Sequence, residues 1–204
     1  LTHHRNPLLS VEHGLTPARA FAIDWLHCLS LGVFGFYVAL VVHLLLAANV
    51  WNVVETTEDA IAAMSFQLLT SELESWYRSP AGALATRIDN ITHTMFGTRG
   101  ALACALRCSE TNGFLEFSVS VLLEKYTGIE NHAEVKRAGM SLLSMYKLIK
   151  AHPVIPVAAV QEFADFTKRY LNIAVKLGWH FKPKDHMLLH MATRIFLQGS
   201  PAYY

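Results

Sequence analysis

Residues 24–50 read DWLHCLSLGVFGFYVALVVHLLLAANV, and this stretch decides how the chain folds. A short run of β-type residues, 21–23, precedes it, so a strand, a carboxylate and a helix are predicted in succession. From residue 29 to residue 50 the run shows no polar face, which predicts a helix that is buried all round or lies in lipid. Asp24 stands at the junction, where the helix dipole favours the ionised carboxylate that binds a hard cation.

Composition limits the classes of protein that this chain can be. At 204 residues it suits one domain or part of one, and its 52% hydrophobic content excludes a disordered protein. Only 16% of its residues are charged, against about 25% in an average soluble domain, so we expect a partner surface or a bilayer to cover part of it. The net charge of +1 gives no global field for nucleic acid, so any DNA contact must be local. The three cysteines lack metal-ligand spacing, which indicates buried thiols in a reducing compartment.

The chain after residue 50 has a helical pattern almost throughout. Thr56 and Asp59 resemble a capping box, which opens a helix that the turn at 79–82 ends. Gly178 has the C′ position of a later helix, and Asp185 caps the last one. The other predicted helices cover residues 102–126 with a break near 112–113, residues 134–150, residues 157–177 and residues 185–198.

Three segments resemble, in the same order, parts of transposases of the CACTA and Plavaka type. Residues 24–33, DWLHCLSLGV, resemble the Asp-x-x-His block that carries the second catalytic carboxylate of those enzymes. Residues 91–97, ITHTMFG, and 109–115, SETNGFL, are similar to a helical block marked by a Glu-Thr pair. Residues 182–190, KPKDHMLLH, resemble the Lys-Pro-Lys-x-His-x-x-x-His stretch before the last catalytic acid.

The resemblance implies a mainly α fold, with a helical insertion domain attached to part of an RNase H-like α/β core. Residues 1–50 would belong to the core, 51–181 to the insertion, and 182–204 to the return to the core. The first catalytic aspartate is expected before Leu1 and the final glutamate after Tyr204, so we expect a piece of a longer protein that is inactive by itself.

The resemblance also implies a function. The full-length protein would be a DNA transposase that cleaves phosphodiesters and transfers strands with two divalent ions, Mg²⁺ or Mn²⁺. Its partners would be transposon ends, target DNA and further copies of itself. A nuclear location is inferred from this function. The sequence itself contains no import signal that would indicate it.

Asp24 is the strongest candidate for a metal ligand, and His27 lies one helical turn further on, where it can orient that carboxylate or reach a phosphate. Lys182 and Lys184 offer local positive charge to a DNA backbone. Each residue also has a simpler interpretation. Asp24 would cap the helix, His27 would be a core histidine, and the lysines would be ordinary solvated side chains.

His186 and His190 have the i, i+4 spacing of a zinc pair, but no third ligand of fixed spacing follows them. We interpret both as packing or supporting groups beneath the active site. Glu110 is better explained as a helix cap than as a catalytic acid, and Cys104 and Cys108 as core thiols.

A membrane protein is the alternative from another class. Residues 29–50 are 22 residues long, enough for a hydrocarbon core about 30 Å thick, and Trp25 and Trp51 bracket them. The chain would then be a single-pass protein with a helical carboxyl-terminal domain. Asp24 and His27 near one boundary and His43 inside the run count against it. An unrelated helical binding module is a third interpretation.

Overall fold

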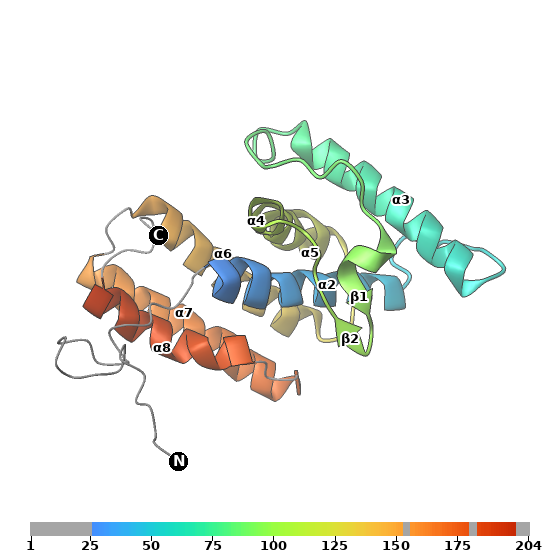
Figure 1. Ribbon diagram of the computed structural model, residues 1–204. Coiled ribbons are helices and arrows are strands. Elements are labelled where there is room, and N and C mark those ends of the chain that lie inside the picture. Colours follow the sequence, from blue (N-terminus) through green and yellow to red (C-terminus); the bar gives the residue numbers. More distant parts are fainter. Residues whose placement is uncertain (1–25, 153–155, 180–182, 199–204) are drawn as a thin grey trace, which may run out of the picture.

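The computed structural model describes residues 26–152, 156–179 and 183–198, and shows them as a helical protein (Figure 1). The mainly α prediction is therefore confirmed. In these ranges the strands are β1 (Gly97–Thr98) and β2 (Ala101–Leu102), which pair antiparallel, so the RNase H-like part of the fold stays a prediction. The predicted strand 21–23, Asp24 and Lys182 lie outside the described residues.

The apolar run forms a continuous helical segment at the centre of the protein. It begins as a π-helix, η3 (Leu26–Phe34), and continues as α2 (Gly35–Ala47), which Figure 1 shows in blue between the other helices. Tyr37, Val38 and Val42 are completely buried. Residues 27–47 are long and apolar enough to cross a membrane, with a mean hydropathy of 2.3, but 61% of the apolar window is buried inside the protein. The helix is covered on several faces because its apolar residues point in all directions.

Three long helices cover one side of α2. They are α6 (His132–Ala151), α7 (Val157–Lys176) and α8 (Pro183–Gln198), and α7 packs against both of the others. Sequence periodicity predicted all three to within a few residues. Gly178 has φ +67° and ends α7 as predicted, because Trp179 N–H donates to Ala174 O and Gly178 N–H to Val175 O.

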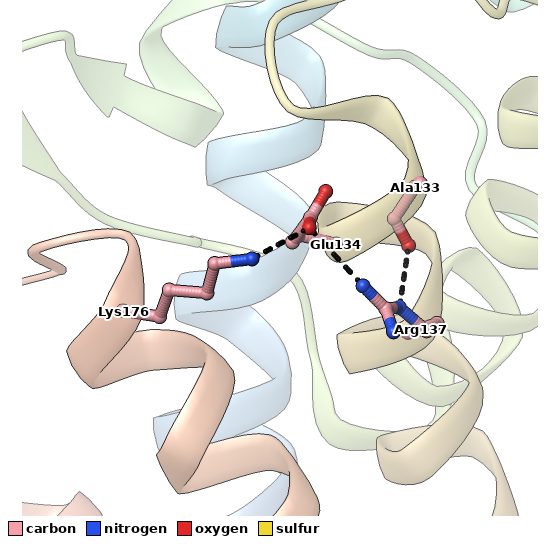
Figure 2. A network of polar contacts seen from close by, with 4 residues as sticks. All are labelled: Ala133, Glu134, Arg137 and Lys176. Carbon is pink, nitrogen blue, oxygen red and sulfur yellow. Dashed lines mark hydrogen bonds and ion pairs between the residues drawn. The ribbon is translucent and has the colours of Figure 1, made fainter.

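An ion pair links the start of α6 to the end of α7 (Figure 2). Lys176 Nζ lies 2.8 Å from Glu134 Oε1, which also accepts a hydrogen bond from Arg137 Nη2 at 3.1 Å. The hydrogen bond from Lys176, more than any other contact, lowers the pKa of Glu134. The contact shows that α6 and α7 run antiparallel.

Helix α3 (Glu58–Tyr77) lies along the outside of the protein, on the far side of α4 from α2 (Figure 1). Its N-cap is Thr57, whose Oγ1 accepts from Ala60 N–H at 3.2 Å, one residue later than the predicted Thr56. Thr57 takes the cap because its backbone is extended there, as a cap requires. Trp76 packs against Phe117 with ring centroids 5.5 Å apart.

The predicted helix break at Asn112-Gly113 is wrong. Helix α4 (Cys108–Phe117) continues through both residues and is followed by η5 (Ser118–Leu122) and α5 (Leu123–Lys125). A Cβ on Gly113 would lie 3.4 Å from Ala85 Cβ, so the missing side chain allows close packing. A glycine in a helix is about 1 kcal/mol less favourable than an alanine. The burial of Phe114 and Leu115 outweighs this cost.

The hairpin of β1 and β2 also departs from the prediction, which had a helix from residue 102, whereas α4 begins at Cys108. The 3₁₀ turn η4 (His93–Phe96) leads into the hairpin, and Phe96 stacks on Phe66 of α3 with centroids 5.9 Å apart. Gly97 has φ +70°, and a Cβ there would overlap Ala101 O. Two-residue strands have no readable period, which explains why they were missed.

Candidate functional site

Of the three segments that carry the transposase resemblance, the first and the third lie against each other. Cys28 of η3 has its thiol 3.4 Å from the backbone carbonyl of Lys184 and 3.6 Å from Met191 Sδ, both on α8. These contacts join residues 156 and 163 positions apart in the sequence. The chain therefore passes from η3 through the other helices and comes back into contact with η3 at α8.

Glycine makes this close approach possible. A Cβ on Gly32 would lie 2.5 Å from Lys184 Cδ and 2.9 Å from His27 O, and a Cβ on Gly35 would lie 3.0 Å from Cys104 Cβ. The two glycines are three residues apart, so they lie on the same side of the helix. Their small size lets α8 and the segment after β2 reach the helix backbone.

A cavity of about 260 Å³ lies at this junction. Its wall includes Gly32 and Phe36 from the central helix, Cys104 from the segment after β2, and Lys184 and Asp185 from α8. Lys184 and Asp185 are thus the charged residues in a lining that is otherwise mostly apolar, which suits a ligand with both polar and apolar parts.

Asp185 is a buried carboxylate that the sequence analysis interpreted only as a helix cap. It lies in the first turn of α8 with 6% of its surface exposed, and its Oδ1 accepts a hydrogen bond from the Tyr170 hydroxyl at 3.3 Å. Burial, followed by the charge of Asp185, raises the pKa of Tyr170 well above its ordinary value, so the phenol remains a donor. No local pattern could have paired these residues, since Tyr170 belongs to α7.

Those residues of the predicted site that the structure describes lie on η3 and α8. His27 is exposed on η3, and Lys184 is half-buried on α8 beside Gly32. His186 and His190 are exposed on α8 and face each other, with Nε2 atoms 3.2 Å apart. The structure thus groups the segments, while Asp24 and Lys182 fall outside the residues that it describes.

Within the described part of the chain, no group of three or more His, Cys, Asp or Glu side chains is placed to hold a metal ion. Asp185 is a buried acid within the motif segment 182–190, and it is engaged with Tyr170. The described residues therefore do not form a two-metal site by themselves, and the Mg²⁺ prediction depends on Asp24.

Two secondary candidates have the structural roles that the sequence analysis preferred. Glu110 Oε2 accepts from Arg107 N–H at 2.7 Å and so caps α4. Burial raises the pKa of the Cys104 thiol, which makes it a poor nucleophile.

Comparison with known family models, with curated proteins and with solved structures finds no match to this chain. The transposase resemblance accordingly stays a prediction from three short motifs.

Proposed function

We propose that this chain is part of a DNA transposase of the CACTA and Plavaka type. Residues 1–50 and 182–204 would belong to an RNase H-like catalytic core, and residues 51–181 would form its helical insertion. The full-length protein would cleave and join DNA strands in the nucleus as an assembly of several copies. Asp24 would bind a metal ion, His27 would orient that carboxylate, and Lys182 and Lys184 would contact the DNA backbone.

The observation that carries this proposal is the contact between η3 and α8. An inserted domain leaves and re-enters its host at neighbouring points, because domain termini commonly lie close together. The thiol of Cys28 and the carbonyl of Lys184, 156 positions apart, meet in this way. This contact supports the proposal because an insertion between the two motifs would bring them together.

The chemistry assigned to the site follows from its ligand types. Mg²⁺ takes oxygen ligands and keeps several waters, so one or two carboxylates per ion are enough. Bound ions of this kind activate a water or a 3′ hydroxyl and stabilise the leaving oxygen of the phosphodiester. In the sequence Asp24 lies two positions before Leu26, where η3 begins, and a helix dipole would favour the ionised form of an acid so placed.

The single-pass membrane alternative has less support. Residues 27–47 pass the length and hydropathy criteria for a span, yet most of the apolar window is buried against other parts of this chain. The Tyr37 hydroxyl in the middle of the segment donates to Val135 O of α6. Contacts of this kind with the rest of the protein are typical of a core helix. Such a helix does not need a bilayer to cover its apolar residues.

The proposal can be tested on the full-length protein with its flanking sequence. We expect nicking of supercoiled plasmid DNA with Mg²⁺ or Mn²⁺, and we expect Asp24→Asn to abolish it while DNA binding is retained, because only metal affinity is removed. Calorimetric titration with Mn²⁺ should show the same loss. Asp89→Asn, at an exposed loop acid, is the matched control and should nick like the wild type. Equal nicking by Asp24→Asn and the wild type would reject the metal role.

A further inference from the structure

The surface of α8 carries a pair of imidazoles whose ring nitrogens converge. His186 and His190 are one turn apart and exposed, with Nε2 atoms 3.2 Å apart and ring centroids 4.9 Å apart. The planes of the two rings are inclined at 72°. The two Nε2 atoms therefore lie close enough for a single ion to contact both.

We propose that His186 and His190 form a bidentate surface site for a divalent transition-metal ion of the Zn²⁺ class. This site is independent of the proposed transposase function and of the Mg²⁺ site at Asp24. Zinc lies about 2.0–2.1 Å from imidazole nitrogen. With the observed nitrogen separation of 3.2 Å, such an ion would bind with an N–metal–N angle of about 100°. That angle falls between the octahedral and the tetrahedral values, so the separation of the two nitrogens suits either coordination geometry.

The backbone beneath the pair holds it in place. Leu188 and Met191 of the same helix are completely buried, which fixes the opposite face of α8 in the core. The two histidines therefore stay on the solvent side at a constant spacing, and little conformational entropy is lost when an ion binds.

The coordination sphere would be open. Within the described residues no third His, Cys, Asp or Glu joins this pair, and the nearby Asp185 is buried and bonded to Tyr170. Water would fill the remaining positions, as it does in open zinc sites, whereas closed structural sites have four protein ligands. Imidazole selects Zn²⁺, Ni²⁺ and Cu²⁺ over Mg²⁺, which prefers oxygen.

A hydrogen bond between the rings is the competing explanation of the short distance. One Nε2–H can donate to the lone pair of the other Nε2, and this requires the two rings to be different tautomers. Metal binding instead requires both Nε2 atoms to be unprotonated. The two explanations differ in whether the pair gives the protein any additional affinity for Zn²⁺.

The experiment is a calorimetric titration of the tag-free full chain with Zn²⁺, with Ni²⁺ as a second probe and Mg²⁺ as a negative control. We expect one Zn²⁺ per chain to be lost in His186→Ala, and equally in His190→Ala and in the double variant, because chelation fails when either ring is removed. Affinity at the site should fall at least tenfold. His93→Ala, which removes an exposed histidine elsewhere, is the matched control and should bind like the wild type.

Thermal unfolding supplies a second measurement that does not depend on counting ions. At Zn²⁺ one hundred times above Kd, the midpoint of the wild type should rise by roughly 5–10 °C, and that of the double variant by much less. The proposal is overturned if the double variant and the wild type bind the same number of Zn²⁺ ions with the same affinity. That result would leave a hydrogen bond between the rings as the explanation of the pair.

Discussion

The Tyr37 hydroxyl donates a hydrogen bond to the backbone carbonyl of Val135 at 2.8 Å and so joins the central helix α2 to the first turns of α6. Tyr37 is completely buried. One turn further along α6, a Cβ on Gly139 would overlap the Tyr37 hydroxyl oxygen and would lie 2.7 Å from Val119 Cγ2. The glycine is therefore the residue that lets the tyrosine reach its partner.

Gly139→Ala should destabilise the protein, although alanine is the better helix former. Overpacking typically lowers the free energy of unfolding by about 1–3 kcal/mol, which exceeds the gain of about 1 kcal/mol in helix propensity. The measurement is urea unfolding followed by circular dichroism. Gly128→Ala, where nothing lies within 4 Å of the added Cβ, should be neutral or slightly stabilising. In a double variant with Tyr37→Phe, the loss in free energy of unfolding should be smaller than the sum of the losses in the two single variants, because the phenylalanine removes the overlapping oxygen. Strict additivity would contradict the contact.

Stability should fall steeply in alkaline solution. Burial raises the pKa of Tyr37 and of Tyr170 above the ordinary value of 10.0, whereas the unfolded chain releases both protons near that pH. Above pH 10 the unfolded state therefore holds fewer protons, and the free energy of unfolding should drop by about 1.4 kcal/mol per pH unit for each tyrosine. Urea midpoints between pH 8 and pH 11.5 measure this. Tyr37→Phe and Tyr170→Phe should each have a shallower slope; the same slope in both variants and the wild type would show that these phenols are not the cause.

Glu72 should be the most important polar group that holds α3 to the rest of the protein. Its Oε1 accepts from Trp51 Nε1 at 3.1 Å, from Lys125 Nζ at 3.0 Å and from the Tyr126 hydroxyl, and only 18% of its side chain is exposed. Glu72→Gln should lower the free energy of unfolding by about 1.5–3 kcal/mol, since hydrogen bonds to a charged acceptor are lost. Glu74→Gln breaks only the exposed ion pair with Arg78 and should cost less than about 1 kcal/mol. Equal losses in the two variants would rule out a special role for Glu72.

The ion pair between Glu134 and Lys176 should stabilise the protein only above acid pH. Because the pKa of Glu134 is lowered in the folded state, its contribution is complete above the ordinary glutamate value of 4.5 and disappears as the pH falls through the folded pKa. Glu134→Gln should therefore have a lower urea midpoint than the wild type at pH 7, and this difference should shrink as the pH falls below 4.5. Glu162→Gln, at an exposed acid of α7, should match the wild type at pH 7. A difference between Glu134→Gln and the wild type that does not shrink below pH 4.5 would point to a cause other than charge.

Lys184 provides a test of DNA contact that does not need catalysis. If it touches a phosphate, Lys184→Gln should weaken binding to duplex DNA and reduce the slope of log K against log salt by about 1. Fluorescence anisotropy between 50 and 200 mM salt, roughly the range where such slopes are measured, gives both quantities. Lys168→Gln removes an exposed lysine of α7 and should leave the slope unchanged. An unchanged slope in Lys184→Gln would remove this lysine from the proposed DNA surface.

Several elements of the fold could be predicted from the sequence because the signals for them are local. The helical period places α6 and α7, and Gly178 ends α7 because it can adopt the left-handed backbone that the cap requires. Glu110 is recognisable as a cap for the same reason, since it bonds to a residue three positions away.

Other features required tertiary structure because they depend on residues that are distant in the sequence. The short strands β1 and β2 have no period, and α4 continues through Gly113 because the burial of Phe114 and Leu115 outweighs the low helix propensity of glycine. Asp185 could be predicted to lie near a helix start, but not to be buried and bonded to Tyr170. The i, i+4 spacing of His186 and His190 was readable, whereas their exposure and the separation of their nitrogens were not.

For the central segment, the sequence by itself determined that the apolar run forms a helix with no polar face, although this helix ends at Ala47 and not at the predicted residue 50. Only the tertiary structure decided which groups cover it, among them Val135 from α6 and the chain around Lys184 from α8. The physical reason is that hydrophobic periodicity reports which faces must leave water, while the identity of the covering surface depends on contacts between residues that are 98 and 156 positions apart.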